Sequence, residues 1–232
     1  MNVIITGASQ GIGKSMAFYF ASKGASLGLC ARNFEKLKVI KQEIEKEYEV
    51  DVYIEQVDVT NLDDATQFIK NVTDKLAPID VLINNAGSFV IGNCSDEPYA
   101  NLQKMLDVNV LSAYYFSKLL IPHFKLYNKG HIMFVGSVAG LQAYQNGGSY
   151  SIAKHALHGL AANLRLELKT HNIKVSNIVP GATYTASWDG SGVAKERIME
   201  SEDIAKVAYM LTQLSSQACP ELLVMRPQLG DL

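Results

Sequence analysis

The chain has 232 residues, of which 48% are hydrophobic and 19% are charged, and its formal net charge is −2. This length and composition are typical of one large α/β domain or two small ones, and they exclude an intrinsically disordered chain. The near-neutral charge gives no reason to expect nucleic acid or an anionic membrane as a partner.

Neither the N-terminus nor the cysteines indicate secretion. The opening MNVIITGASQ has no basic segment leading into a long apolar one, so it does not look like a signal peptide, and no apolar run approaches the roughly 20 residues of a membrane span. Cys30, Cys94 and Cys219 form an odd, widely spaced set without a C-x-x-C pair. They are typical of reduced thiols rather than of disulfides or a metal site. We therefore expect a soluble, cytoplasmic protein without a metal.

Short β-branched runs alternate with longer amphipathic segments along the chain. The expected strands are Val3–Ile5, Ser26–Ala31, Asp51–Val57, Asp80–Ile83, His131–Val135, Ile173–Val179 and Glu221–Met225. The expected helices are Ile12–Lys23, Phe34–Tyr48, Asn61–Leu76, Leu102–Tyr127 (one long helix or two consecutive ones), Ser149–Thr170 and Ser201–Leu214. Asn61 and Ser201 are expected to provide the N-caps of their helices.

The alternation of strands and helices predicts the fold class. It implies right-handed βαβ crossovers and a parallel sheet that is covered by helices on both faces. The sequence contains no linker, repeat or low-complexity segment. Residues 1–232 are therefore expected to form a single doubly wound α/β domain whose parallel sheet has about seven strands.

A glycine-rich turn follows the first strand directly. It reads Thr6-Gly7-Ala8-Ser9-Gln10-Gly11-Ile12-Gly13 and opens a helix. Glycines permit such a tight turn and let backbone N–H groups approach a pyrophosphate at the helix N-terminus. The spacing is G-x-x-x-G-x-G rather than G-x-G-x-x-G, because Met16 stands where the last glycine would be. A glycine-rich turn can be only a turn, but its place between strand and helix favours a nucleotide.

The end of the second strand bears on the choice of cofactor. NAD sites place an acidic residue about 20 positions past the glycines, where it binds the ribose 2′-hydroxyl. Here the chain reads Cys30-Ala31-Arg32-Asn33, with no acid before Glu35. Arg32 can instead bind a 2′-phosphate through charge-assisted hydrogen bonds, the alternative being a solvated surface arginine. The sequence therefore predicts NADP(H) over NAD(H).

A tyrosine and a lysine lie one helical turn apart downstream of the fifth strand. Tyr150 and Lys154 fall on the same face of their helix, and a nearby positive charge lowers the pKa of a tyrosine. Tyr150 is thus a candidate proton donor and acceptor near neutral pH. Ser137, at the expected strand end, can aim its hydroxyl at the same point. A Y-x-x-x-K pair alone also occurs by chance in many helices.

Seven motifs in order resemble the short-chain dehydrogenase/reductase family over nearly the whole chain. They are TGASQGIG at 6–13, Asp58 in VDVT, NNAG at 84–87, Asn109 in DVNV, Ser137, Y-x-x-x-K at 150–154, and Pro180-Gly181 with Thr185. The resemblance implies a Rossmann-like fold and an NADP(H)-dependent oxidoreductase that acts on a carbonyl or a secondary alcohol.

The resemblance also implies which residues form the site. Those that would contact the cofactor are Gly7, Ser9, Gln10, Gly11, Ile12, Gly13, Arg32, Asn33, Asp58, Val59, Asn85, Ala86, Gly87, Tyr150, Lys154, Pro180, Gly181, Thr183 and Thr185. Those that would be catalytic are Asn109, Ser137, Tyr150 and Lys154.

Each catalytic residue has an expected task. Tyr150 would exchange a proton with the substrate oxygen as hydride is transferred, and Ser137 would donate a hydrogen bond to that oxygen. Lys154 would lower the pKa of Tyr150 and hydrogen-bond the nicotinamide ribose. Asn109 would hold a water that relays protons to Lys154, or it would be a helix-interior asparagine bonded to nearby backbone.

Two departures from the family pattern bear on the subtype. Many NADP-preferring relatives carry a basic residue where this chain has Gln10, which leaves Arg32 as the main basic determinant, with Lys14 assisting. The C-terminal ELLVMRPQLGDL lacks the glycine-rich ending of ketoacyl reductases. It resembles small carbonyl reductases, including sepiapterin-reductase-like members.

The substrate pocket is expected around the loop after Thr185, ASWDGSGVAKER, whose glycines suit a mobile lid. The rings that would form a compact pocket are Phe89, Tyr144, Tyr184 and Trp188. The alternative is that these rings only pack against the scaffold. A small or cyclic carbonyl compound fits such a pocket better than a long acyl chain.

Assembly and competing functions complete the expectations. Helices 102–127 and 149–170 carry more apolar residues than one buried face requires, and in the family such helices pair, so a homodimer or homotetramer is expected. The alternative functions are a catalytically silent NADP(H)-binding sensor, a ketoacyl-thioester reductase, and an epimerase or dehydratase on the same fold.

Overall fold

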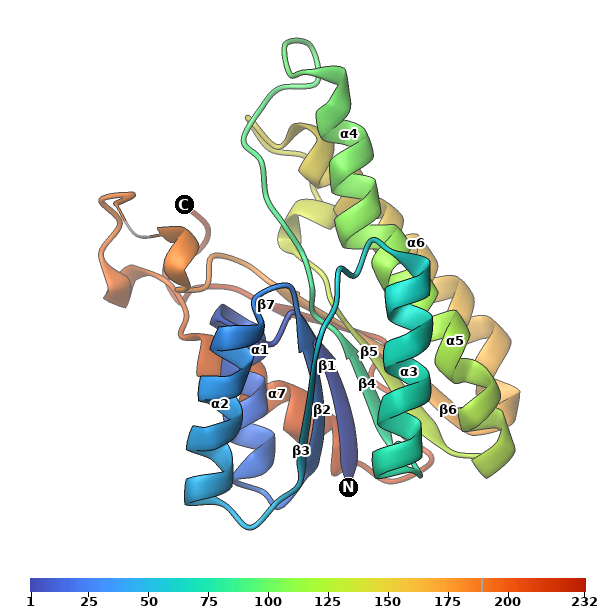
Figure 1. Ribbon diagram of the computed structural model, residues 1–232. Coiled ribbons are helices and arrows are strands. Elements are labelled where there is room, and N and C mark those ends of the chain that lie inside the picture. Colours follow the sequence, from blue (N-terminus) through green and yellow to red (C-terminus); the bar gives the residue numbers. More distant parts are fainter. Residues whose placement is uncertain (189) are drawn as a thin grey trace.

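Seven parallel strands form the central sheet of the computed structural model, which describes residues 1–188 and 190–232 (Figure 1). The strands are β1 Asn2–Thr6, β2 Ser26–Ala31, β3 Val52–Gln56, β4 Val81–Asn84, β5 Gly130–Val135, β6 Ile173–Pro180 and β7 Leu222–Met225. Their order in the sheet is β3-β2-β1-β4-β5-β6-β7, and every neighbouring pair is parallel. The predicted α/β class with a parallel sheet of seven strands is confirmed.

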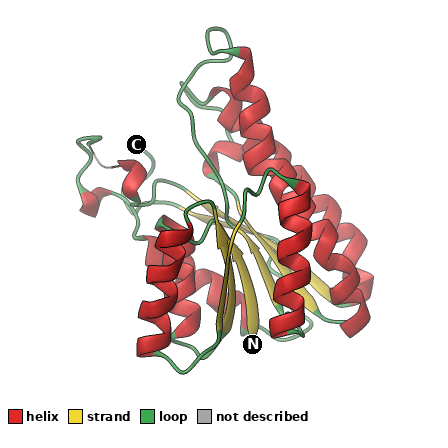
Figure 2. Ribbon diagram, in the orientation of Figure 1, coloured by secondary structure: helices red, strands yellow, loops and turns green. Residues whose placement is uncertain are grey.

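Helices cover both faces of this sheet (Figure 2). They are α1 Gly11–Ala21, α2 Phe34–Glu47, α3 Leu62–Leu76, α4 Tyr99–Leu106, α5 Ser112–Tyr127, α6 Gly148–Leu168 and α7 Ser201–Thr212. In Figure 1, α1, α2 and α7 lie on one face, and α3, α5 and α6 lie on the other. The sequence placed each of these elements to within a few residues.

The strand pleat explains the two cores. Successive strand residues point to opposite faces of a sheet, so Val3 and Ile5 share one face and Ile4 the other. Val3 and Ile5 pack with Phe20 of α1, whereas Ile4 packs with Phe116 of α5, and all five side chains are fully buried. Because both faces are covered, the strands read as nearly continuous apolar runs.

The predicted cap of the last helix is wrong. Glu200, not Ser201, is the N-cap of α7: its carboxylate accepts the backbone N–H of Asp203, and the Asp203 carboxylate accepts the Glu200 N–H at 3.3 Å. This is a reciprocal capping box. The Ser201 hydroxyl is used elsewhere, because its Oγ lies 2.6 Å from Oγ of Ser15 on α1.

The segment predicted as one long helix or two is continuous from Tyr99 to Tyr127 with a change of winding inside it. A π-helical stretch, Asp107–Leu111, joins α4 to α5 and contains the buried Asn109. Such wide turns are rare and often occur at functional sites, because they displace one side chain from the regular helical face.

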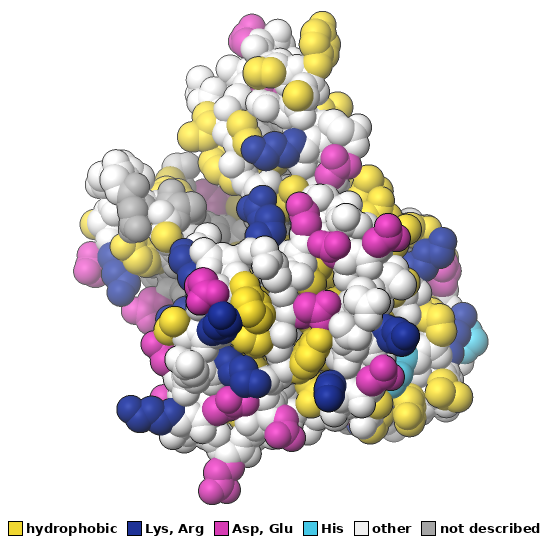
Figure 3. Space-filling view, viewed as in Figure 1, with side chains coloured by type: hydrophobic (Ala, Val, Ile, Leu, Met, Phe, Trp, Pro, Cys, Tyr) yellow, Lys and Arg dark blue, Asp and Glu magenta, His cyan; other side chains and the backbone are white. Residues whose placement is uncertain are grey.

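The sheet order places the functional region. It reverses between β1 and β4, and in doubly wound folds ligands bind in the crevice outside the carboxyl ends of the strands at this point. In the described residues no helix is long and apolar enough to cross a membrane. On the face drawn in Figure 3, positive and negative side chains are interspersed rather than gathered by sign.

Candidate active site

The turn between β1 and α1 is a cradle lined by backbone. Gly7 and Gly11 have φ values of +66° and +55°, a region that favours glycine. A Cβ on Gly7 would lie 2.8 Å from the Cα of Ala86, and one on Gly13 would collide with the carbonyl of Gly7. Gln10, the N-cap of α1, makes no side-chain cap bond, so the N–H groups of the first turn stay available for an anion.

The end of β4 holds this turn in place. The Thr6 hydroxyl oxygen accepts the N–H groups of Asn85 at 3.1 Å and of Ala86 at 3.0 Å. The Asn85 amide donates to the carbonyls of Thr6 at 2.9 Å and Gly7 at 3.2 Å. Because the side-chain amide of Asn85 donates both of these hydrogen bonds to backbone carbonyls, we expect Asn85 to act in cofactor binding by holding the shape of the cradle.

The loop after β6 closes the other side. A Cβ on Gly11 would lie 3.1 Å from Cγ2 of Thr185, so Thr185 rests against the cradle. Upstream, the Gly181 N–H donates to the carbonyl of Met225 at 2.7 Å, and the Thr183 hydroxyl donates to the carbonyl of Gly181 at 3.0 Å. Thr185 thus lies beside the glycine turn, and contact of the residues from Pro180 to Thr185 with the nicotinamide stays a prediction.

The residues predicted to meet the adenosine end lie after β2 and β3. The Asn33 side chain caps α2 by accepting the Lys36 N–H at 3.0 Å. The Asp58 carboxylate accepts the N–H of Thr60 at 3.0 Å and its hydroxyl at 2.8 Å, and these bonds hold the Asp58 pKa below its usual range. Val59 is buried and Arg32 is exposed. Contact of these four residues with a cofactor stays a prediction.

Lys36 is a basic residue that the sequence analysis missed. Its Nζ donates to Oε1 of Gln10 at 3.0 Å, which places an ammonium next to the glycine turn. A surface cavity of about 520 Å³ there is lined by Ser9, Gln10, Gly11, Lys14, Asn33, Glu35, Lys36, Val39 and Ile40. Lys14 is less available, because its Nζ lies 3.7 Å from the carboxylate of Glu43. The sequence did contain one signal for Lys36: it lies in the first turn of the helix that follows Arg32, on the same side of the predicted cofactor site.

Ser137, Tyr150 and Lys154 meet at the carboxyl end of β5. The Ser137 hydroxyl oxygen accepts the Ala139 N–H at 3.1 Å, and the Ser137 side chain lies near enough to the Tyr150 phenol to favour a lower pKa there. Lys154 is buried, and its Nζ donates to the carbonyl of Val135 at 3.0 Å and lies 5.7 Å from the centre of the Tyr150 ring. These three side chains thus lie together at this strand end, and their catalytic roles stay a prediction.

The predicted effect of Lys154 on the pKa of Tyr150 is wrong for this arrangement. Burial raises the Tyr150 pKa, and the nearby Ser137 side chain only opposes this rise. Burial also lowers the pKa of Lys154 to about 8, because removing an ammonium from water disfavours its charge. Tyr150 is therefore protonated at neutral pH, whereas Lys154 is close to losing its proton.

Asn109 takes the helix-interior arrangement. Its amide nitrogen donates to the carbonyls of Ser88 and Met105, each at 3.0 Å, and its Oδ1 accepts the Ser88 N–H at 3.4 Å. The same Oδ1 lies near Lys154: a Cβ on Gly87 would be 2.9 Å from Oδ1 and 3.8 Å from Lys154 Nζ. The proton relay through a water at Asn109 stays a prediction.

One of the four predicted pocket rings, Phe89, lies against the Tyr150 ring. The Phe89 ring meets the Tyr150 ring edge to face, with centroids 4.9 Å apart and planes at 81°. Burial raises the pKa of Tyr144 to about 12, and the neighbouring Tyr150 contributes to this rise. Tyr184 instead lies under the ammonium of Lys195, 5.3 Å from its ring centre. Residue 189 of the loop predicted as a lid lies outside the described residues.

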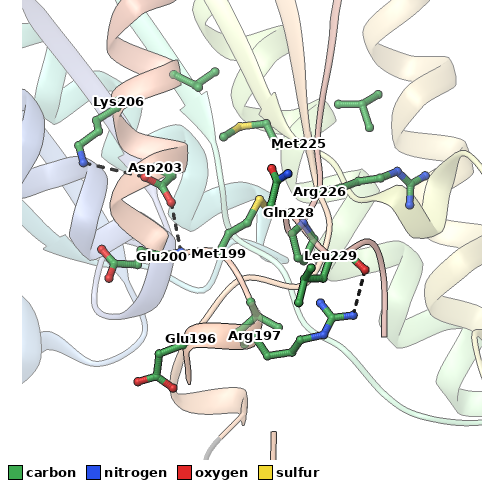
Figure 4. Close-up of a pocket in the computed structure, with 14 residues that line it drawn as sticks. Glu196, Arg197, Met199, Glu200, Asp203, Lys206, Met225, Arg226, Gln228 and Leu229 are labelled. Atoms are coloured by element: carbon green, nitrogen blue, oxygen red, sulfur yellow. Dashed lines mark hydrogen bonds and ion pairs between the residues drawn. The ribbon is translucent and has the colours of Figure 1, made fainter. Parts of the chain in front are cut away.

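A larger cavity of about 900 Å³ lies behind the loop after β6 (Figure 4). It is bounded by α7, the end of β7 and the C-terminal tail, and none of the predicted catalytic residues lines it. Arg197 ties this tail to the lid segment by donating to the carbonyls of Gly230 at 2.9 Å and Asp231 at 3.0 Å. This cavity is therefore separate from the predicted reacting centre, and its lining supports the loop after β6.

Comparisons with known proteins agree with this geometry. Residues 1–194 match the family model described as short chain dehydrogenase. An uncharacterised oxidoreductase of Staphylococcus epidermidis is 30% identical over 213 residues, which is 91% of each chain. An alcohol dehydrogenase from the archaeon Thermococcus sibiricus, complexed with 5-hydroxy-NADP, is 26% identical with a TM-score of 0.90, over 98% of this chain and 96% of that one. A 7α-hydroxysteroid dehydrogenase complexed with NADH and 7-oxo glycochenodeoxycholic acid is 28% identical with a TM-score of 0.92, over 99% and 94% of the chains.

The buried Lys154 predicts how stability depends on pH. Its pKa is about 8 in the folded chain and stays near 10.5 in the unfolded chain, so between these values the unfolded chain binds more protons and stability rises with pH. Relative to Lys154→Met, the wild-type free energy of unfolding should therefore rise between about pH 8 and pH 10, by up to roughly 3 kcal/mol. Urea denaturation of both variants across this range measures it. Parallel pH profiles would mean that Lys154 titrates normally.

Proposed function

The chain belongs to the short-chain dehydrogenase family, and from that premise we propose that it transfers a hydride between NADP(H) and a carbonyl or secondary alcohol of a small substrate. The observation that carries this proposal is the meeting of Ser137, Tyr150 and Lys154 at the end of β5. A protonated phenol in a buried site is suited to donate its proton to a carbonyl oxygen.

The residues of the cradle fit a nicotinamide dinucleotide. A Cβ on Gly7 or Gly13 would collide with neighbouring backbone, so the tight turn requires glycine there, and the N-terminus of α1 presents backbone N–H groups and the positive end of its dipole at this turn. The residues that would hold the dinucleotide are Gly7, Ser9, Gln10, Gly11, Ile12, Gly13, Asn85, Ala86, Gly87, Pro180, Gly181, Thr183 and Thr185. When bound, the cofactor supplies or accepts the hydride.

The catalytic side chains divide the remaining work. Ser137 already accepts the Ala139 N–H at its oxygen, so its proton can be donated to the substrate oxygen and hold that atom against Tyr150. Tyr150 gives its phenolic proton to the oxygen of a carbonyl substrate. Lys154, with its pKa lowered to about 8, can release a proton at Nζ to restore the phenol. We propose that Asn109 holds the water that returns this proton to Lys154.

We propose NADP(H) as the preferred cofactor because two cations flank the adenosine end. Arg32 follows β2 directly and is exposed, and Lys36 is held next to the glycine turn by Gln10. No acidic residue precedes Glu35 after β2, which is the residue type that would favour the free 2′-hydroxyl of NAD(H). Gln10 thus takes an indirect role: it positions a lysine instead of supplying the basic group itself.

The small carbonyl-reductase type is also part of this proposal. The Phe89 ring lies edge to face against Tyr150, which supports a compact aromatic pocket for a small or cyclic ketone. No described feature favours the alternatives. A silent sensor has no physical need of a phenol beside Ser137, a ketoacyl-thioester reductase would need room for an acyl chain, and an epimerase or dehydratase would show product without net cofactor turnover.

Substitution of the phenol tests the reaction. Tyr150→Phe should lower kcat for carbonyl reduction by about 10²–10⁴-fold while leaving the dissociation constant of NADPH nearly unchanged, because only the proton donor is removed. The assay is substrate-dependent NADPH oxidation over a panel of ketones, diketones, pteridines and β-hydroxy acids. Wild-type binding of NADPH without turnover across the panel would favour the sensor, and turnover of acyl thioesters alone would contradict the compact pocket.

Substitution of the two cations tests the cofactor preference. Arg32→Ala and Lys36→Ala should each lower the ratio of kcat/KM for NADPH over NADH by about tenfold, since each removes a charge-assisted hydrogen bond to a 2′-phosphate. Calorimetry with 2′,5′-ADP and 5′-ADP should show the same change in binding without turnover. Lys38→Ala is the matched control, because Lys38 pairs with Glu35 at 2.9 Å. Equal wild-type efficiency with NADH would refute the preference.

Homo-oligomerisation is proposed from the outer surfaces of two long helices. Tyr114 of α5 and Ile152 and Leu166 of α6 are exposed apolar side chains. Burying such surfaces between copies of the chain would remove them from water. Sedimentation of the protein at micromolar concentration should give a dimer or tetramer, and we expect Leu166→Lys to reduce its mass. A monomeric wild type would contradict this proposal. Enzyme activity found only in the monomer fractions would contradict it as well.

A further inference from the structure

Helix α6 carries Tyr150 and Lys154 but has no cap within its own sequence. Its N-cap, Gly147, has no side chain, and the next residue, Gly148, has a φ of +40°. The first N–H groups of a helix lack partners inside the helix and need an acceptor from elsewhere. The start of the helix on which Tyr150 sits therefore depends on a second part of the chain.

Glu97 supplies that acceptor from the loop between β4 and α4. Its Oε1 accepts the backbone N–H of Ser149 at 2.9 Å and also the Ser149 hydroxyl, across a sequence separation of 52 residues. Ser149 is fully buried and directly precedes Tyr150. The other carboxylate oxygen, Oε2, is also buried and has no hydrogen-bond partner among the described residues. A carboxylate at a helix N-terminus also interacts favourably with the helix dipole.

The backbone joins the same two segments. The Gly92 N–H donates to the carbonyl of Asn146 at 3.2 Å, and the Asn146 N–H donates to Oδ1 of Asn93 at 3.1 Å. A Cβ on Gly148 would collide with the carbonyl of Gly92, so the two loops are in direct backbone contact. Phe89, in the loop after β4, meets the Tyr150 ring edge to face. The loop from residue 88 to 98 therefore touches the phenol and also holds the start of its helix.

We propose that Glu97 is a positioning residue for Tyr150, acting through Ser149 and the first turn of α6. This inference rests on the proposed function, because its consequence is the rate of proton donation. A misplacement of about 1 Å at a reacting group can cost about 10²-fold in rate. Glu97 does not touch the reacting atoms, and the cradle for the dinucleotide is built from other residues. Its loss should therefore lower kcat and leave cofactor binding in place.

The test compares three substitutions in one loop. Glu97→Ala should lower kcat by about 10–100-fold with a dissociation constant for NADPH within about twofold of wild type. Glu97→Gln should restore kcat to within about threefold, because the accepting oxygen is kept and only the charge is lost. Asp96→Ala is the matched control: Asp96 is exposed, and among the described residues its carboxylate accepts only the Ser95 hydroxyl, at 3.0 Å, so its removal should change neither quantity.

Hydrogen exchange provides a readout that needs no substrate. Glu97→Ala should speed exchange of the amides of residues 149–151, and Asp96→Ala should not. Unchanged exchange or an unchanged kcat in Glu97→Ala would overturn the proposal, and so would a joint loss of kcat, NADPH binding and thermal stability, which indicates a structural role alone. If Glu97→Ala does not fold, Glu97→Asp takes its place, because the shorter side chain withdraws the accepting oxygen from the Ser149 N–H, and an unchanged kcat there has the same meaning. A wild type without turnover would refute the proposed function instead, and the exchange result would still decide on the contact.

Discussion

The hydrogen bonds between Thr6 and residues 85–86 are the contact on which the rest of the site depends. They join the ends of β1 and β4, the two central strands between which the sheet order reverses. A crevice exists at this point because the crossovers on either side lead away from it in opposite directions. The absence of a side chain at Gly7 lets the two backbones approach, and Asn85 then fixes the shape of the turn.

The catalytic side chains depend on a second buried contact, between Lys154 and the carbonyl of Val135. It anchors α6 to the end of β5 and therefore sets where Tyr150 stands relative to Ser137. Burying an ammonium is unfavourable unless it is hydrogen-bonded, and here the cost appears as a lowered pKa. The same burial raises the pKa of Tyr150, so the two neighbouring groups have pKa values shifted in opposite directions, as the proposed proton transfer requires.

The surroundings of this pair come from segments that are distant in the sequence. The loop after β4 provides Phe89 against the phenol and Glu97 at the start of its helix. The loop after β6 is anchored to β7 through Gly181 and to the C-terminal tail through Arg197. Both loops are therefore held by the scaffold at one end and border the reacting groups at the other, which is how a shared fold can present different substrate pockets.

The sequence by itself determined the fold class and predicted which residues would form the site. Strand Ser26–Ala31 and the capped start of the helix at Asn61 were predictable, because apolar runs and capping side chains act between neighbouring residues. The glycine turn and the Tyr150–Lys154 pair could also be predicted from the sequence, because each lies within a few neighbouring residues.

Only the tertiary structure decided how these parts act on one another. Lys36 reaches Gln10 across 26 residues and Glu97 reaches Ser149 across 52, and no local pattern encodes such pairings. Ser201 is a good cap by type, yet its hydroxyl meets Ser15, and Glu200 caps the helix instead. The direction of the Tyr150 pKa shift likewise reversed, because burial, which depends on the packing of the whole chain, outweighs a lysine one turn away.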